Sequence, residues 1–86
     1  MPSARADELR RVAAKLGFRR ARQTGSHERW KHADGRSTTI PIHSGREIGP
    51  PLIYRILEQL GIDEETFSRL VANFAEAPPA SQVENA

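Results

Sequence analysis

The segment His27–His43, HERWKHADGRSTTIPIH, decides the fold that we predict for this chain. Apolar and β-branched residues alternate with polar ones on both sides of Asp34-Gly35, which is the pattern of a β-hairpin. Residues that pair across an antiparallel ladder point to the same side of the sheet. A three-residue loop at positions 33–35 pairs Trp30 with Thr38 and keeps both on the buried face. We therefore predict a type I turn followed by a left-handed glycine.

This register places a second set of side chains on the opposite, open face of the hairpin. On the first strand, alternation with Trp30 puts His27, Arg29 and Lys31 there. On the second strand the set is Thr39, Pro41 and His43. His27 then pairs with Pro41, and His43 lies one diagonal step away, at roughly 7–8 Å between backbones. The sequence thus predicts a basic sheet face that carries two histidines.

The residues before the hairpin predict one helix and one edge strand. Residues 5–16 repeat apolar side chains at i, i+3, i+4 and i+7, with Ser3 or Asp7 as the cap, and residues 1–6 are expected to fray. Residues 18–23 contain few apolar side chains, so the sequence does not decide which side of this strand is buried. Three arginines in this strand would discourage edge-to-edge aggregation.

Two helices are predicted after the hairpin. The first begins at Pro50-Pro51 and ends at Gly61, and the second follows Asp63 as its N-cap. Residues 75–86 contain two prolines and no periodicity, which predicts a disordered tail behind a single domain of residues 1–74. The expected class is therefore α+β, a helix, a three-stranded antiparallel sheet and a helix, with an added C-terminal helix. The apolar stripe expected on the helix before Gly61 is Leu52, Ile53, Ile56, Leu57 and Leu60.

The amino-acid composition indicates the cellular compartment and the kind of binding partner to expect. The 86 residues contain no cysteine, which fits a reducing cytoplasm. No apolar run approaches the roughly 18 residues of a membrane span. Residues 1–61 carry 12 Lys/Arg against 6 Asp/Glu, whereas residues 62–86 carry 1 against 5. A basic body of this kind favours a polyanionic partner, although an unevenly charged soluble surface would look the same.

The three histidines allow different interpretations. His27 follows the turn Gly25-Ser26 among cations, so it is a candidate for phosphate chemistry or a surface residue bonded to the turn. His43 is a solvated strand end or a substrate contact. His32 shares the face of Trp30, which favours packing or a turn hydrogen bond. Because His32 faces away from the other two, a zinc site made of the three is disfavoured.

The motifs together resemble the HicA family, the toxins of bacterial HicAB toxin–antitoxin pairs. The resemblance covers about residues 8–71. It rests on Gly17-Phe18, on Arg22-Gln23-x-Gly25-Ser26-His27, on His32-x-Asp34-Gly35, on Ile40-Pro41-Ile42-His43, and on Ile56-Leu57 with Gly61-Ile62. The entry to the helix, Gly49-Pro50-Pro51-Leu52, and the C-terminal extension depart from the family pattern.

The resemblance implies a fold related to double-stranded RNA-binding domains and a metal-independent ribonuclease that cuts mRNA. The family's catalytic histidine falls on His27, no cofactor is implied, and the partner is a HicB-type antitoxin. We expect Arg22, Arg29 and Lys31 to hold the phosphate, and His43 to be a second acid–base group or a substrate contact. The expected RNA-binding residues are Arg20, Arg22, Gly25, Ser26, Arg29, Lys31, Arg36 and Arg46.

Two other functions remain open at this point. A module of the same fold could hold RNA without cutting it, and loss of RNA that depends on His27 separates the two. The basic face could also exist only to dock an acidic protein. RNA affinity that falls steeply with salt would argue against that alternative.

Overall fold

The computed structural model describes residues 3–42 and 46–76 and has an α+β fold. A three-stranded antiparallel sheet has the order β2-β3-β4, and two short strands, β1 and β5, form a separate antiparallel pair. The elements in chain order are β1 (Ala4–Arg5), α1 (Ala6–Lys15), β2 (Arg19–Thr24), β3 (His27–Lys31), β4 (Ser37–Pro41), β5 (Glu47–Ile48), α2 (Leu52–Leu60) and α3 (Glu64–Glu76). This arrangement confirms the predicted class and is consistent with the RNA-binding-domain-like description.

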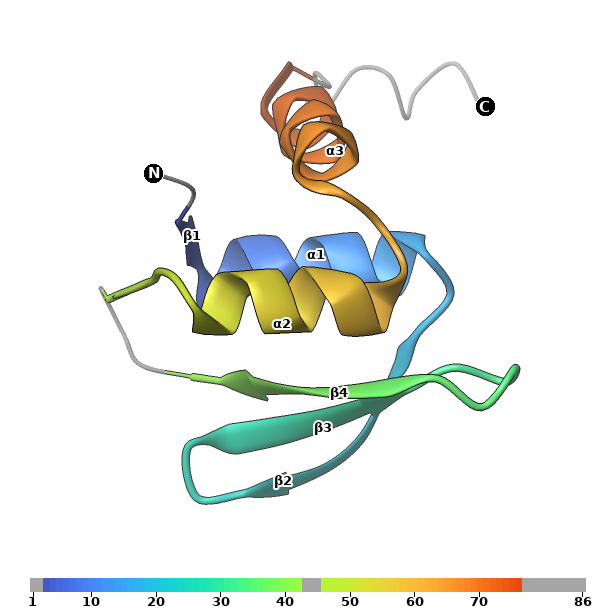
Figure 1. Cartoon of the computed structure of the whole chain (residues 1–86). Coiled ribbons are helices and arrows are strands. Elements are labelled where there is room, and N and C mark those ends of the chain that lie inside the picture. The colour runs from blue at the N-terminus through green and yellow to red at the C-terminus, as the bar shows by residue number, and fades with distance from the viewer. Residues whose placement is uncertain (1–2, 43–45, 77–86) are drawn as a thin grey trace, which may run out of the picture.

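The elements form three layers. Helices α1 and α2 lie side by side over one face of the sheet, and α3 lies on the far side of these helices (Figure 1). No helix among the described residues covers the other face of the sheet. Within the same residues, no helix is long and apolar enough to cross a membrane.

The core lies between the sheet and the helix pair. In α1, Leu9, Val12 and Ala13 are buried at the predicted helical spacing. In α2 the buried stripe is narrower than predicted, because Leu52 is 38% exposed at the start of the helix. The remaining large side chains of the core are Phe18, Trp30, Ile40, Ile48, Ile53, Ile56, Leu57, Leu60 and Phe67.

The hairpin register is confirmed. Trp30 pairs with Thr38 and His27 with Pro41. The Gly35 N–H donates to the His32 carbonyl at 3.0 Å, and Gly35 has φ +102°, a conformation that glycine adopts without a Cβ clash. The buried Thr38 hydroxyl donates to Gln59 Oε1 at 2.6 Å, which ties β4 to α2.

Strand β2 is an edge strand, as predicted, and it contains a β-bulge. Arg20 pairs with Trp30, and the next pair is Arg22 with Arg29, so Ala21 is the extra residue. Alternation normally places residues i and i+2 on one face. Here the inserted residue interrupts the alternation of side chains along β2, so Arg20 and Arg22 point to opposite faces of the sheet.

The N-terminus differs from the prediction. Residues 4 and 5 were expected to fray, but Ala4 pairs with Ile48 and is only 2% exposed. The N-cap of α1 is Arg5, whose backbone N–H donates to Glu8 Oε1 at 2.9 Å. Ser3, a predicted cap, instead donates its hydroxyl to Glu47 Oε1 at 2.6 Å. The pairing of two distant segments therefore fixes the start of α1.

The C-terminal helix begins as predicted. Asp63 Oδ1 accepts the Thr66 N–H at 2.8 Å, which is the N-cap bond. Phe67 is 7% exposed and packs on the core. Helix α3 continues to Glu76, two residues into the predicted tail, while residues 77–86 lie outside the described residues.

Candidate functional site

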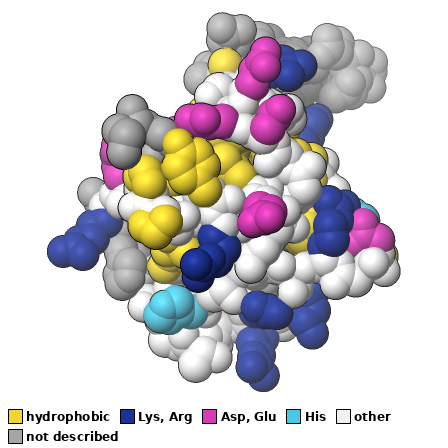
Figure 2. Space-filling view, in the orientation of Figure 1, with side chains coloured by type: hydrophobic (Ala, Val, Ile, Leu, Met, Phe, Trp, Pro, Cys, Tyr) yellow, Lys and Arg dark blue, Asp and Glu magenta, His cyan; other side chains and the backbone are white. Residues whose placement is uncertain are grey.

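The sheet face turned away from the helices, which we call the open face, collects basic and hydroxyl side chains. The strand register identifies its residues, because two residues that pair across neighbouring strands point to the same side of the sheet. They are Arg19, Arg22 and Thr24 from β2, His27, Arg29 and Lys31 from β3, and Ser37, Thr39 and Pro41 from β4. Lys and Arg side chains gather around the sheet, and Asp and Glu around α3 (Figure 2).

His27 is held at the first position of β3 by a two-residue turn. Thr24 pairs with His27 across Gly25 and Ser26. Gly25 has φ +58° and no non-glycine residue among those described has positive φ, which fits a type II′ turn. The Ser26 carbonyl also accepts the Ile42 N–H at 2.6 Å, so β4 continues alongside this turn. The exposed imidazole therefore lies at a fixed place on the open face, as predicted.

Arg22, Arg29 and Lys31 line a hollow of about 250 Å³ together with Ala21. Arg29 donates to Thr39 Oγ1 at 2.9 Å and to Ser37 Oγ at 2.8 Å, which fixes its guanidinium over β4. Both acceptors are neutral, so these bonds orient the guanidinium without neutralising it. The arrangement is suited to an anion. We call this feature the cationic pocket.

Arg20, predicted among the RNA-binding residues, is placed on the other face. Its Nη1 donates to Glu28 Oε2 at 3.1 Å. Glu28 is 2% exposed and also accepts a hydrogen bond from Trp30 Nε1 at 3.1 Å. It forms an ion pair with Arg10, whose Nε lies 3.1 Å from Glu28 Oε1. This buried network joins β3 to β2 and α1. Glu28 was not predicted as an inward-facing residue, although it alternates with His27 and Arg29 and shares the face of Trp30.

Arg36 is held by structural contacts. Its Nη1 donates to the Leu60 carbonyl at 2.7 Å, and its guanidinium carbon lies 5.1 Å from the centre of the Phe18 ring. Its backbone N–H and its guanidinium bind Asp34, and they hold the pKa of that carboxyl below its usual range. These contacts within the protein give Arg36 a structural role that does not require RNA.

The other predicted site residues are separated from His27 or lie outside the description. His32 packs edge-on against Phe18, with ring centres 5.1 Å apart, and its Nδ1 accepts the Asp34 N–H at 3.0 Å. Both predicted roles of His32, packing and a turn bond, are thereby confirmed. His43 lies outside the described residues, and Arg46 is exposed just after that gap. The described part of the chain contains no group of three His, Cys, Asp or Glu that could hold a metal ion.

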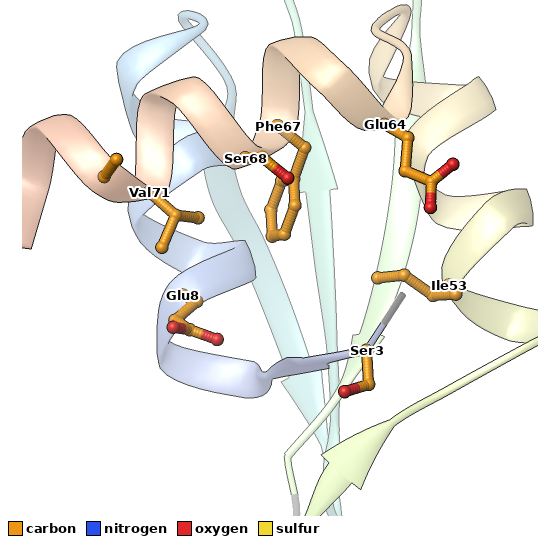
Figure 3. A pocket seen from close by; sticks show the side chains of 8 residues that line it. Ser3, Glu8, Ile53, Glu64, Phe67, Ser68 and Val71 are labelled. Atoms are coloured by element: carbon orange, nitrogen blue, oxygen red, sulfur yellow. The ribbon is translucent and has the colours of Figure 1, made fainter. Parts of the chain in front are cut away.

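A larger hollow of about 500 Å³ lies away from the open face, between α3 and the layer below it (Figure 3). Its titratable lining residues are Glu8 and Glu64, and no cationic side chain lines it. Ser3, Phe67 and Val71 supply much of the remaining wall. Negative charge makes this hollow unsuitable for a phosphate, so the open face is the better candidate site.

The fold and the open face define a class of small α+β proteins that offer an uncovered, basic sheet to a polyanion. The model of a protein family, the HicA toxin of bacterial toxin–antitoxin systems, matches residues 6–62, and the chain belongs to this family. Membership implies, in general, an RNase-like toxin that acts on RNA and has a cognate antitoxin. The match ends before α3 (Glu64–Glu76). Among curated proteins, no match was found.

Proposed function

We propose that this chain is a metal-independent endoribonuclease that cuts mRNA with His27 as its general base. The observation that carries the proposal is the position of His27: an exposed imidazole, fixed by a tight turn, on the same face as Arg22 and Arg29. Imidazole is the side-chain group that ordinarily titrates near neutral pH, so it can accept and return a proton under cellular conditions.

The proposed reaction needs no group beyond the protein and the RNA. His27 removes the proton from a ribose 2′-hydroxyl, and the resulting oxygen attacks the adjacent phosphorus. The bond from phosphorus to the 5′ oxygen of the next nucleotide breaks, and that oxygen takes up a proton. The products are a 2′,3′-cyclic phosphate and a free 5′-hydroxyl. His43, predicted on the same face, is our candidate for delivering the second proton.

The surrounding cations supply the binding energy in this proposal. Arg22, Arg29 and Lys31 attract the RNA backbone, and a guanidinium binds phosphate oxygens through paired hydrogen bonds. Gly25 and Ser26 form the turn before His27, so they lie at the border of the proposed site. Arg46 stays a proposed backbone contact, whereas the structural contacts of Arg20 and Arg36 remove our reason for including them.

The partner is proposed to be a HicB-type antitoxin that covers the open face. A protein that lays acidic side chains on Arg29 and Lys31 would occupy the same surface as the RNA, so binding would block cleavage. Charge complementarity of this kind gives specificity and fast association.

The test is the His27→Ala variant, with Thr24→Ala as a control at the cross-strand partner. Losing the general base lowers the cleavage rate at least about 10²-fold. An exposed substitution changes stability by no more than about 0.5 kcal/mol. We expect RNA binding to persist in His27→Ala, and wild-type cleavage to continue in excess EDTA.

Four results would contradict the proposal. Cleavage by the wild type that stops in EDTA would point to a metal. Full cleavage by His27→Ala would remove His27 from the mechanism, and unfolding of that variant would make the residue structural. RNA binding by the wild type without cleavage would favour a binding module.

A further inference from the structure

The cationic pocket has a charge distribution that costs stability in the free protein. Arg22 and Arg29 are directly opposed across β2 and β3, where like charges destabilise a sheet. None of the residues that line the pocket is acidic. The carboxylate nearest along β3, Glu28, faces the core and binds Arg10 and Arg20 instead. The pocket therefore concentrates positive charge that an anion would balance.

The bulge creates both the charge and the space of this pocket. Because Ala21 is the inserted residue, Arg22 moves into register with Arg29 instead of following Arg20 to the buried face. Ala21 itself lines the hollow with a single methyl group. A larger side chain at this position would fill the space that an anion would occupy.

The position of the pocket relative to His27 decides which phosphate it can hold. Residues two apart on one strand face are separated by roughly 7 Å. Lys31 is therefore two such steps from His27 along β3, and Arg29 is one step. His27 does not line the pocket. A general base has to lie within hydrogen-bond reach of the proton that it removes, about 2.6–3.2 Å.

We infer that the cationic pocket binds a phosphate of the RNA strand next to the one that is cut. This inference rests on the proposed function. The phosphate is held between the guanidinium groups of Arg22 and Arg29 and the ammonium of Lys31. It sets the register of the strand, so that the reacting 2′-hydroxyl reaches His27. The three residues are thus specificity determinants for a substrate with at least one phosphate beyond the scissile group.

The first experiment compares short RNA substrates. One is a dinucleotide with a single phosphodiester, and the others are the same dinucleotide with a terminal phosphate at its 5′ or its 3′ end. We expect one extended form to raise kcat/KM of the wild type about tenfold, the effect of one charge-assisted contact. In Arg22→Gln and Lys31→Gln, the ratio of kcat/KM for the extended dinucleotide to kcat/KM for the unextended one falls toward one. In Arg55→Gln, which removes an exposed cation of α2, it stays at the wild-type value.

A substitution that changes no charge provides a second arm. Ala21→Leu fills the hollow and keeps all three cations, so it lowers the same ratio if the phosphate enters the pocket. If neither extension raises kcat/KM, the inference is wrong. It is equally wrong if Arg22→Gln lowers kcat/KM by the same factor on all substrates, because that result would place the Arg22 guanidinium at the scissile phosphate.

Binding of uncleavable probes separates this inference from the proposed reaction. A 2′-deoxy dinucleotide lacks the attacking hydroxyl, and its Kd is measured by calorimetry with and without the terminal phosphate. We expect the terminal phosphate to tighten binding to wild type and to His27→Ala, but not to Arg22→Gln. A wild type that fails to cleave yet shows this preference disproves only the reaction. A wild type that cleaves without the preference disproves only the pocket.

Discussion

Arg22 lies directly opposite Arg29 in the antiparallel ladder, so two arginines occupy paired positions on the open face of the sheet. Arg29 is turned toward β4 by its bonds to Ser37 and Thr39, which limits the repulsion but does not remove the charge. A sheet selected for stability alone would place an opposite charge or a hydroxyl at one of these positions. The pair is part of the cationic pocket that we propose to bind a phosphate.

Replacing Arg22 with threonine should stabilise the free protein. The change removes a like-charge pair and introduces a residue with high β-propensity, a gain of about 0.2–1 kcal/mol. Urea unfolding at low ionic strength measures the difference, and the gain should shrink as salt screens the repulsion. Arg55→Thr, on the exposed face of α2, should show no such gain. A loss of stability in Arg22→Thr would contradict this account of the pair.

Replacing Glu28 with alanine should destabilise the fold. The buried Trp30 Nε1–H loses its acceptor, and an unsatisfied buried donor costs about 1–3 kcal/mol. Arg10 and Arg20 are partly exposed and can turn to water, so we assign them no further loss. Glu28→Gln keeps an amide oxygen for Trp30 and should lose less, as measured by urea unfolding. Equal losses in the two variants would mean that the charge, rather than the bond to Trp30, is what stabilises the fold.

The N-cap of α3 should weaken in acid. Hydrogen bonds from Thr66, from its side chain and then its backbone N–H, hold the pKa of Asp63 below its usual range. The folded pKa is thus lower than the unfolded value of about 3.9. The stabilisation is complete above that value and is lost as pH falls through the folded pKa. Asp63→Asn keeps a cap at all pH values, so its stability should fall less than that of the wild type below about pH 4. Parallel stability–pH curves for the two proteins would refute this role.

Charge reversal on the open face should weaken binding of both RNA and the antitoxin. Arg29→Glu with Lys31→Glu removes two phosphate partners, so the slope of log affinity against log salt should fall by roughly 1.4 to 1.8. A HicB-type antitoxin that docks on this face should also bind more weakly, whereas Arg55→Glu should affect neither partner. Antitoxin affinity that is unchanged while RNA binding disappears would show that the two partners use different surfaces.

The hairpin and the facing of β3 were predictable because one residue determined both. Trp30 had to be buried, and with Gly35 in the left-handed conformation only one loop length satisfied that condition. The positions of His27, Arg29 and Lys31 followed by alternation. In this strand, local turn chemistry and side-chain facing agree with the tertiary structure.

The facing of β2 could not be predicted for a physical reason. Residues 18–23 contain only Phe18 and Ala21 as apolar side chains, so burial does not define one side of the strand. The bulge depends on partners in other elements, since Arg20 turns inward to reach Glu28. The pairing of Ala4 with Ile48 was missed for a similar reason, because a two-residue strand carries no periodicity.

In the described part of the chain, acidic and basic side chains lie in different layers, a separation of charge that the net charge of +2 conceals (Figure 2). Asp63, Glu64 and Glu65 lie at the start of α3, whereas Arg22, Arg29 and Lys31 belong to the sheet. Acidic side chains gather around α3 and basic side chains around the sheet (Figure 2). The field of a polyanion would exert a torque on such a charge distribution and turn the basic sheet toward the polyanion before contact. We expect a larger fraction of diffusional encounters to begin with the open face toward the RNA strand, which would raise the association rate without adding a contact.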